Sequence, residues 1–95
     1  MIKKISNREV RGSNFTILVQ GIHQIRYIGN DRVALIEIEG GLNKNGEVNW
    51  LVYKETLKGW EPPHEMDKMT ENDRMEIFIN ISKSLALLEM PHKFL

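Results

Sequence analysis

The spacing of apolar residues changes once along this chain, and that change constrains the fold more than any other feature. Up to residue 54, apolar and polar residues mostly alternate, which is the period of a β-strand with one buried face. From residue 75 onward, apolar residues recur three and four positions apart, which is the period of an amphipathic helix. We therefore expect an α+β fold, in which an antiparallel sheet of four to five strands packs against one C-terminal helix.

Four segments carry the strand pattern, and turns rich in glycine and asparagine separate them. They are residues 14–21, 23–30, 32–40 and 47–54. Residues 32–40 are apolar on both faces at their start, which favours a central position in the sheet. Gly29-Asn30-Asp31 predicts the turn before this segment, and Gly40-Gly41 together with residues 43–46 predicts the turn after it. Residues 2–10 form a weaker strand, which we place at an edge because lysines protect an exposed edge from pairing.

A helix is predicted from about residue 70 to 89. Thr70 and Asp73 form a capping-box pattern, with aspartate in the place usually taken by glutamate or glutamine. Pro91 ends the helix, and residues 92–95 follow as a tail or a short strand. An apolar stripe should lie on the sheet, and it consists of Met75, Ile77, Phe78, Ile81, Leu85 and Leu88. Residues 1–95 then form a single domain, with strands within 1–54, a Trp-Pro-Pro loop at 57–69 and this helix.

Composition excludes several classes of protein. The 95 residues include no cysteine, so a disulfide framework, a thiolate metal site and a cysteine nucleophile are all ruled out. Polar and charged residues follow Met1 and Ile2 where a secretion signal would be apolar. Apolar runs are far shorter than the roughly 20 residues that span a bilayer. We expect a cytoplasmic protein with no membrane role.

The net charge of zero conceals an uneven distribution. Residues 1–32 carry six basic and two acidic side chains, whereas residues 61–76 carry six acidic ones and only two basic ones. A domain with one basic and one acidic region can steer charged partners even when its total charge is zero. Both regions can equally be solvated faces. The basic third and Tyr27 leave open an alternative function, that of a small nucleic-acid-binding or regulatory module.

Patterns for catalysis and for metal binding are weak. His23, His64 and His92 lie far apart and in none of the paired spacings that hold zinc. No nucleophile elbow and no phosphate-binding glycine loop occurs. Glu37 and Glu39 share a strand face, but solvent exposure explains them better than a pair of catalytic carboxylates does. We predict no enzymatic activity, no cofactor and no metal.

The segment "KGWEPPHEMD" (58–67) is the best candidate for a partner-binding surface. Pro62 and Pro63 restrict their own backbone and bias Glu61 away from helix, so that Trp60 sits on a stiff, extended segment. Its indole either anchors a partner or closes the end of the core, and the second role is favoured because a small domain needs large apolar side chains. The predicted partner-binding residues are Trp60, Glu61, His64, Glu65, Asp67, Glu71 and Asp73.

Residues 52–88, "VYKETLKGWEPPHEMDKMTENDRMEIFINISKSLALL", carry a strand, a W-x-P-P turn, a T-x-x-[DE] helix start and an I-x-x-x-I helix. Together with "ALIEIEG" (34–40), this run resembles the small immunity proteins encoded beside bacterial polymorphic toxins, including contact-dependent growth inhibition systems. The resemblance implies a cytoplasmic, non-enzymatic antidote that binds one cognate toxin, often a nuclease, and blocks its active site or target-binding surface. The resemblance identifies no individual toxin-binding residues and does not indicate an oligomeric state.

Two mechanisms of inhibition follow as hypotheses. In the first, the acids between residues 61 and 76 mimic nucleic-acid phosphates in the basic cleft of a nuclease. In the second, a toxin strand adds to an exposed edge of the sheet, and main-chain hydrogen bonds supply the affinity.

Overall fold

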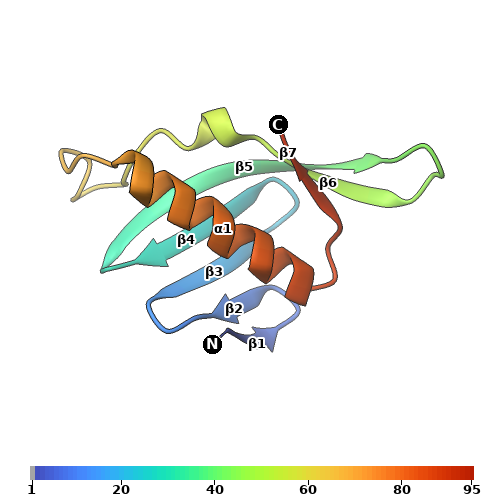
Figure 1. Ribbon diagram of the computed structural model, residues 1–95, viewed down its shortest axis with the longest axis horizontal. Helices are drawn as coiled ribbons and strands as arrows, with labels where there is room; N and C mark the ends of the chain where they lie inside the picture. The colour runs from blue at the N-terminus through green and yellow to red at the C-terminus, as the bar shows by residue number, and fades with distance from the viewer. Residues whose placement is uncertain (1) are drawn as a thin grey trace.

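The computed structural model describes residues 2–95 and shows one long helix lying across one face of a sheet (Figure 1). The strands are β1 (Lys3–Ser6), β2 (Glu9–Arg11), β3 (Phe15–Gln20), β4 (Gln24–Gly29), β5 (Arg32–Leu42), β6 (Val48–Val52) and β7 (His92–Phe94). A short 3-10 helix, η1 (Lys54–Thr56), and the long helix α1 (Glu71–Leu87) lie between β6 and β7. The α+β class is therefore confirmed. The sheet has seven strands, in the order in which they occur along the chain, rather than four to five.

The two additional strands have separate causes. Residues 2–10 were predicted as one edge strand, but the chain turns at Asn7 and Arg8, and β1 and β2 pair antiparallel on either side of the turn. After the helix, Pro91 directs the chain back along β6, and the Trp50 amide donates to the Pro91 carbonyl at 2.7 Å. A strand that returns through a helix can run parallel to its neighbour. β7 does so, and the sheet is therefore mixed rather than antiparallel.

The centre of the sheet is an antiparallel meander of β3, β4 and β5. Ile17 pairs with Tyr27, which in turn pairs with Ala34, and all three side chains point to the helix side and are buried. The β4–β5 turn consists of Asn30 and Asp31, whose φ angles of 52° and 62° are those of a tight hairpin turn. The sequence predicted the two strands of this hairpin and its turn correctly.

The β5–β6 hairpin extends beyond the rest of the sheet, and we call the part from residue 39 to residue 51 the arm (Figure 1). Gly40 and Gly41 were predicted to lie in its turn, but they belong to β5 and pair with Trp50 and Asn49. The turn itself is formed by residues 43–46. Because the arm leaves the body, its alternating apolar residues are more exposed than the sequence predicted.

One core joins the sheet to the helix. Ile77, Ile81, Leu85 and Leu88 of the predicted stripe are buried, and Phe78 packs at the margin of the core. Met75 was predicted to join them but is exposed. Arg74 takes the sheet-facing place in that turn and donates to the Leu57 carbonyl at 2.7 Å. Within residues 2–95, no helix has both the length and the apolar character needed to cross a bilayer.

Candidate functional site

The Trp-Pro-Pro loop, residues 57–69, lies beside the N-terminus of α1 at one end of the molecule (Figure 1). Its first attachment is to the edge of β5, where the Glu61 amide donates to the Val33 carbonyl at 2.7 Å. Two turns follow, closed by the His64 amide on the Glu61 carbonyl and by the Asp67 amide on the His64 carbonyl. The segment is thus folded back on itself, and the predicted extended conformation is wrong after Glu61.

Trp60 belongs to the core. Only 6% of its surface is exposed, and the guanidinium of Arg32 covers one face of the indole ring. The bond from Glu61 to β5 draws the preceding residue inward, which explains this placement. Of the two roles considered for the indole, closing the core is the one the structure shows, and the ring is not an exposed anchor.

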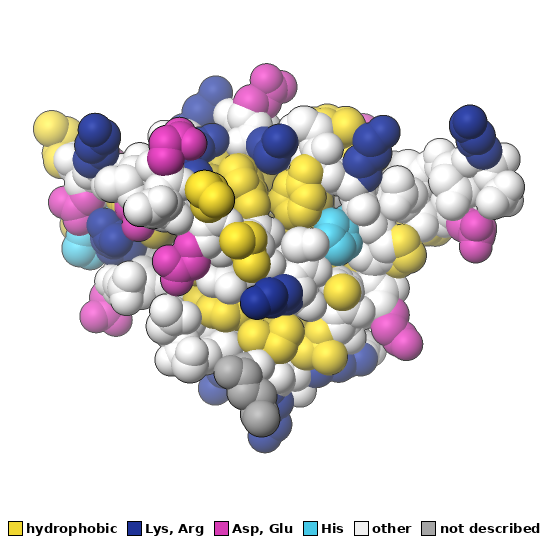
Figure 2. Space-filling view, viewed as in Figure 1, with side chains coloured by type: hydrophobic (Ala, Val, Ile, Leu, Met, Phe, Trp, Pro, Cys, Tyr) yellow, Lys and Arg dark blue, Asp and Glu magenta, His cyan; other side chains and the backbone are white. Residues whose placement is uncertain are grey.

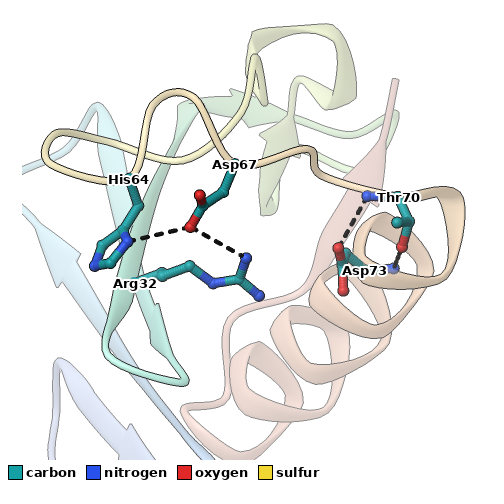
Figure 3. A network of polar contacts seen from close by, with 5 residues as sticks. All are labelled: Arg32, His64, Asp67, Thr70 and Asp73. Atoms are coloured by element: carbon teal, nitrogen blue, oxygen red, sulfur yellow. Dashed lines mark hydrogen bonds and ion pairs between the residues drawn. The ribbon is translucent and has the colours of Figure 1, made fainter.

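Asp67 connects the loop to the sheet through its carboxylate (Figure 3). Oδ2 lies 3.2 Å from Nδ1 of His64 and 3.8 Å from the guanidinium of Arg32. Arg32 therefore contacts Trp60 and Asp67 at once. Since the His64 and Asp67 side chains are partly exposed, each of these contacts contributes little to stability. Their effect is to fix where the loop lies.

The start of α1 is fixed by the predicted capping box. The Asp73 amide donates to the Thr70 hydroxyl at 3.0 Å, and the Thr70 amide donates to the Asp73 carboxylate at 2.9 Å (Figure 3). The Thr70 amide bond lowers the pKa of Asp73, and the Thr70 hydroxyl and the positive charge of Arg32 act in the same direction. The Asp73 carboxylate is therefore held in place by the helix start.

The seven residues predicted to bind a partner thus divide into two groups. Trp60 is buried, Asp67 and His64 contact each other, and Asp73 caps the helix, so these four hold the loop in shape. Glu61 is half-buried and Glu65 and Glu71 are exposed, and no described side chain forms an ion pair with any of the three. Charged side chains crowd this end of the molecule in the space-filling view (Figure 2).

The sequence prediction missed Met66. It lies between Glu65 and Asp67 at the tip of the loop, and 90% of its surface is exposed. Methionine adapts its shape to a partner more readily than branched residues do. Its position in a loop of polar residues was the available signal, because such a position leaves it no core to enter.

A second feature at the opposite end was also missed. A hollow of about 360 Å³ opens near the base of the arm, and its walls include Arg8, Val19, Ile22, Trp50 and Met90. These residues come from distant parts of the chain, so no local motif could have revealed the hollow.

The described residues contain no cluster of three or more His, Asp or Glu side chains that could hold a metal ion.

Comparison with known proteins agrees with the resemblance seen in the sequence. The model of one family, described as Immunity protein 74, matches residues 17–94. No curated protein and no solved structure matches the chain. The match covers well over half of the chain and spans β3 to β7, including the Trp-Pro-Pro loop and α1. The chain belongs to the Immunity protein 74 family.

Proposed function

We propose that the protein neutralises a cognate bacterial nuclease toxin by binding it in the cytoplasm, and that it catalyses no reaction itself. Membership of an immunity protein family supports toxin neutralisation in general. A contact-dependent growth inhibition system is one setting in which such a toxin would reach the cell. The choice of a nuclease rests on the acidic end of the molecule, where Glu61, Glu65 and Glu71 lie.

The observation that carries this proposal is a set of carboxylates that form no described ion pair and whose backbone is held by hydrogen bonds. Glu65 follows His64, whose amide and side chain are both held, and Glu71 is the first residue of a capped helix. Their positions therefore need little ordering when a partner binds, which reduces the entropic cost of association. A nuclease binds phosphates through basic side chains, so a preformed acidic surface is complementary to its cleft.

Charge reversal tests the proposal. Changing Glu65→Lys and Glu71→Lys together should weaken toxin binding by at least about 100-fold at low salt, mainly through a slower association rate. Glu37→Lys with Glu55→Lys is the matched control, because these exposed acids lie outside the loop and helix start. Binding would be measured by surface plasmon resonance at several salt concentrations.

Equal effects of the two double variants would contradict the proposed surface. If neither changes binding, addition of a toxin strand becomes the better mechanism. β1 offers the edge for that, since its four residues are all exposed. Ile5→Pro should then abolish binding, because proline removes a backbone donor from the edge. Under the acidic-surface mechanism the same change should leave binding almost unaffected.

A further inference from the structure

The hollow near the base of the arm has the size of a small-molecule site. It measures about 360 Å³, and its walls come from the β1–β2 turn, the end of β3, the turn after β3, β6 and the segment after α1. Sites for small ligands occupy roughly 300–1,000 Å³ and have mostly apolar walls with a few polar groups. The hollow lies at the lower end of this range, so it admits only a small ligand.

The apolar walls of the hollow are Val19, Ile22, Trp50 and Met90. Val19 is buried in the core, and Trp50 and Met90 pack against the core while part of each side chain stays exposed. Ile22 is 58% exposed and lies in a turn, where glycine and polar residues are usual. The fold therefore uses only part of this apolar surface, and the matching part of a ligand is apolar.

Arg8 is the one charged side chain among the described residues that line the hollow, and hydrogen bonds fix its position. The Val19 amide donates to the Arg8 carbonyl at 2.8 Å, which holds the β1–β2 turn against β3. Nη1 of the guanidinium donates to the Gly21 carbonyl at 2.9 Å and to the Val19 carbonyl at 3.4 Å. The cation is therefore held beside the apolar walls before any ligand binds, which lowers the entropic cost of binding.

The chemistry of Arg8 selects the charged end of the ligand. Nη1 is occupied by two carbonyls, whereas Nε and Nη2 have no partner among the described residues, and Arg8 forms no described ion pair. Two neighbouring N–H groups of a guanidinium match the two oxygens of a carboxylate. Phosphate sites usually add a helix N-terminus or further donors, and the described lining of the hollow has one cation and no helix N-terminus. A singly charged carboxylate is therefore the better match.

We propose that the hollow binds a small amphiphilic carboxylate, with its carboxylate on Nε and Nη2 of Arg8 and its apolar tail along Ile22, Trp50 and Met90. Arg8 is exposed, which limits the strength of the ion pair, so most of the affinity comes from the tail. The hollow lies near the base of the arm, and the Trp-Pro-Pro loop lies at the other end of the molecule (Figure 1). Binding there is independent of the proposed function, because no residue of the acidic end takes part.

Titration of the purified full chain with sodium octanoate, followed by heteronuclear NMR, tests the proposal. We expect saturable shifts of the Ile22 amide and the Trp50 indole N–H, with a dissociation constant on the order of 1 mM, and no shift of the buried Trp60 indole. Octanol has the tail without the charge and should bind about fivefold more weakly, and acetate has the charge without the tail and should not saturate. Absence of saturation up to about 20 mM octanoate, or equal affinity for octanol, overturns the proposal.

Two variants identify the contacts. Arg8→Gln should weaken octanoate binding about fivefold and leave octanol binding unchanged, because it removes the cation alone. Arg11→Gln is the matched control, since Arg11 pairs with Glu9 and does not line the hollow. Ile22→Ser should weaken the binding of both ligands, because it shortens the apolar wall. Circular dichroism melting of each variant separates lost binding from lost folding. Octanoate affinity that is the same in Arg8→Gln and in Arg11→Gln contradicts the contact between the carboxylate and Arg8.

Discussion

The guanidinium carbon of Arg32 lies 4.2 Å from the centroid of the Trp60 indole ring, in the range of a cation–π contact. Arg32 is the first residue of β5, and Trp60 lies in the Trp-Pro-Pro loop, so the contact joins the sheet to the loop. Because Arg32 also pairs with Asp67, one side chain holds the loop at two points.

Replacing Arg32 by methionine should lower the free energy of unfolding by about 1 kcal/mol, since it removes the cation and keeps most of the apolar stem. Urea denaturation followed by tryptophan fluorescence gives this value. Arg26→Met serves as the control, because Arg26 forms no described ion pair or cation–π contact. A loss no larger than that of the control would show that the contact with Trp60 adds nothing to stability.

Stability should depend on pH through Asp73. Its pKa is lowered in the folded protein from the ordinary 3.8, chiefly by the amide of Thr70. A lowered folded-state pKa gives a contribution that is complete above the unfolded value and disappears as the pH falls through the folded value. Asp73→Asn should therefore destabilise the protein at pH 7 and have less effect near pH 2, as measured by urea titrations at each pH. An effect of equal size at both pH values would contradict this origin.

Ser84 offers a stabilising substitution. Its side chain is fully buried, and its hydroxyl oxygen has no hydrogen-bond partner among the described residues. Ser84→Ala removes an unsatisfied polar atom and introduces the best helix former, so it should raise the free energy of unfolding by roughly 1 kcal/mol. Ser82→Ala is the control. The Ser82 hydroxyl lies 2.9 Å from Nε2 of His92, so its removal should lower the free energy of unfolding. A destabilised Ser84→Ala would mean that the hydroxyl is in fact satisfied.

The turn of the arm should depend on Asn43. Its side-chain oxygen accepts the amides of Asn45 and Glu47 at 2.8 and 3.0 Å. Asn43→Ala should cost about 1 kcal/mol, because two amides lose their acceptor, whereas Asn45→Ala should cost almost nothing. Hydrogen exchange of the arm amides would detect this as faster exchange confined to residues 39–51. Uniform acceleration across the protein would instead indicate a global effect.

The elements that the sequence predicted well depend on local chemistry. Alternation located β3, β4 and β5 correctly, and Thr70 with Asp73 marked the helix start because a capping box is formed by residues three apart. Seven strands were not predictable in the same way. β1 and β2 are too short for a clear period. Residues 92–95 were predicted as a tail or a short strand, and they form β7 because the helix returns the chain to β6.

The sequence predicted that the acidic residues of the candidate site lie together, but not what each of their side chains contacts. Acidic residues clustered in sequence remain clustered in space, since loop and helix start are consecutive. The sequence could not show which acids lack an ion-pair partner. The partner of Asp67, for example, is Arg32, which is distant in the sequence and lies on β5. The hollow at the arm was invisible for the same reason, as Arg8, Ile22, Trp50 and Met90 meet only through the tertiary fold.

The strand order follows the order of synthesis from β1 to β6, and this has a consequence for how the protein forms. Each new strand leaving the ribosome finds its partner already made, so the meander needs only short loop closures, which are fast. β7 alone must join a strand made some 40 residues earlier, because Trp50 pairs with His92. We expect pulse-labelling hydrogen exchange to show protected amides in β3, β4 and β5 before those of β7, so that a nascent chain halted before the helix already holds most of its sheet.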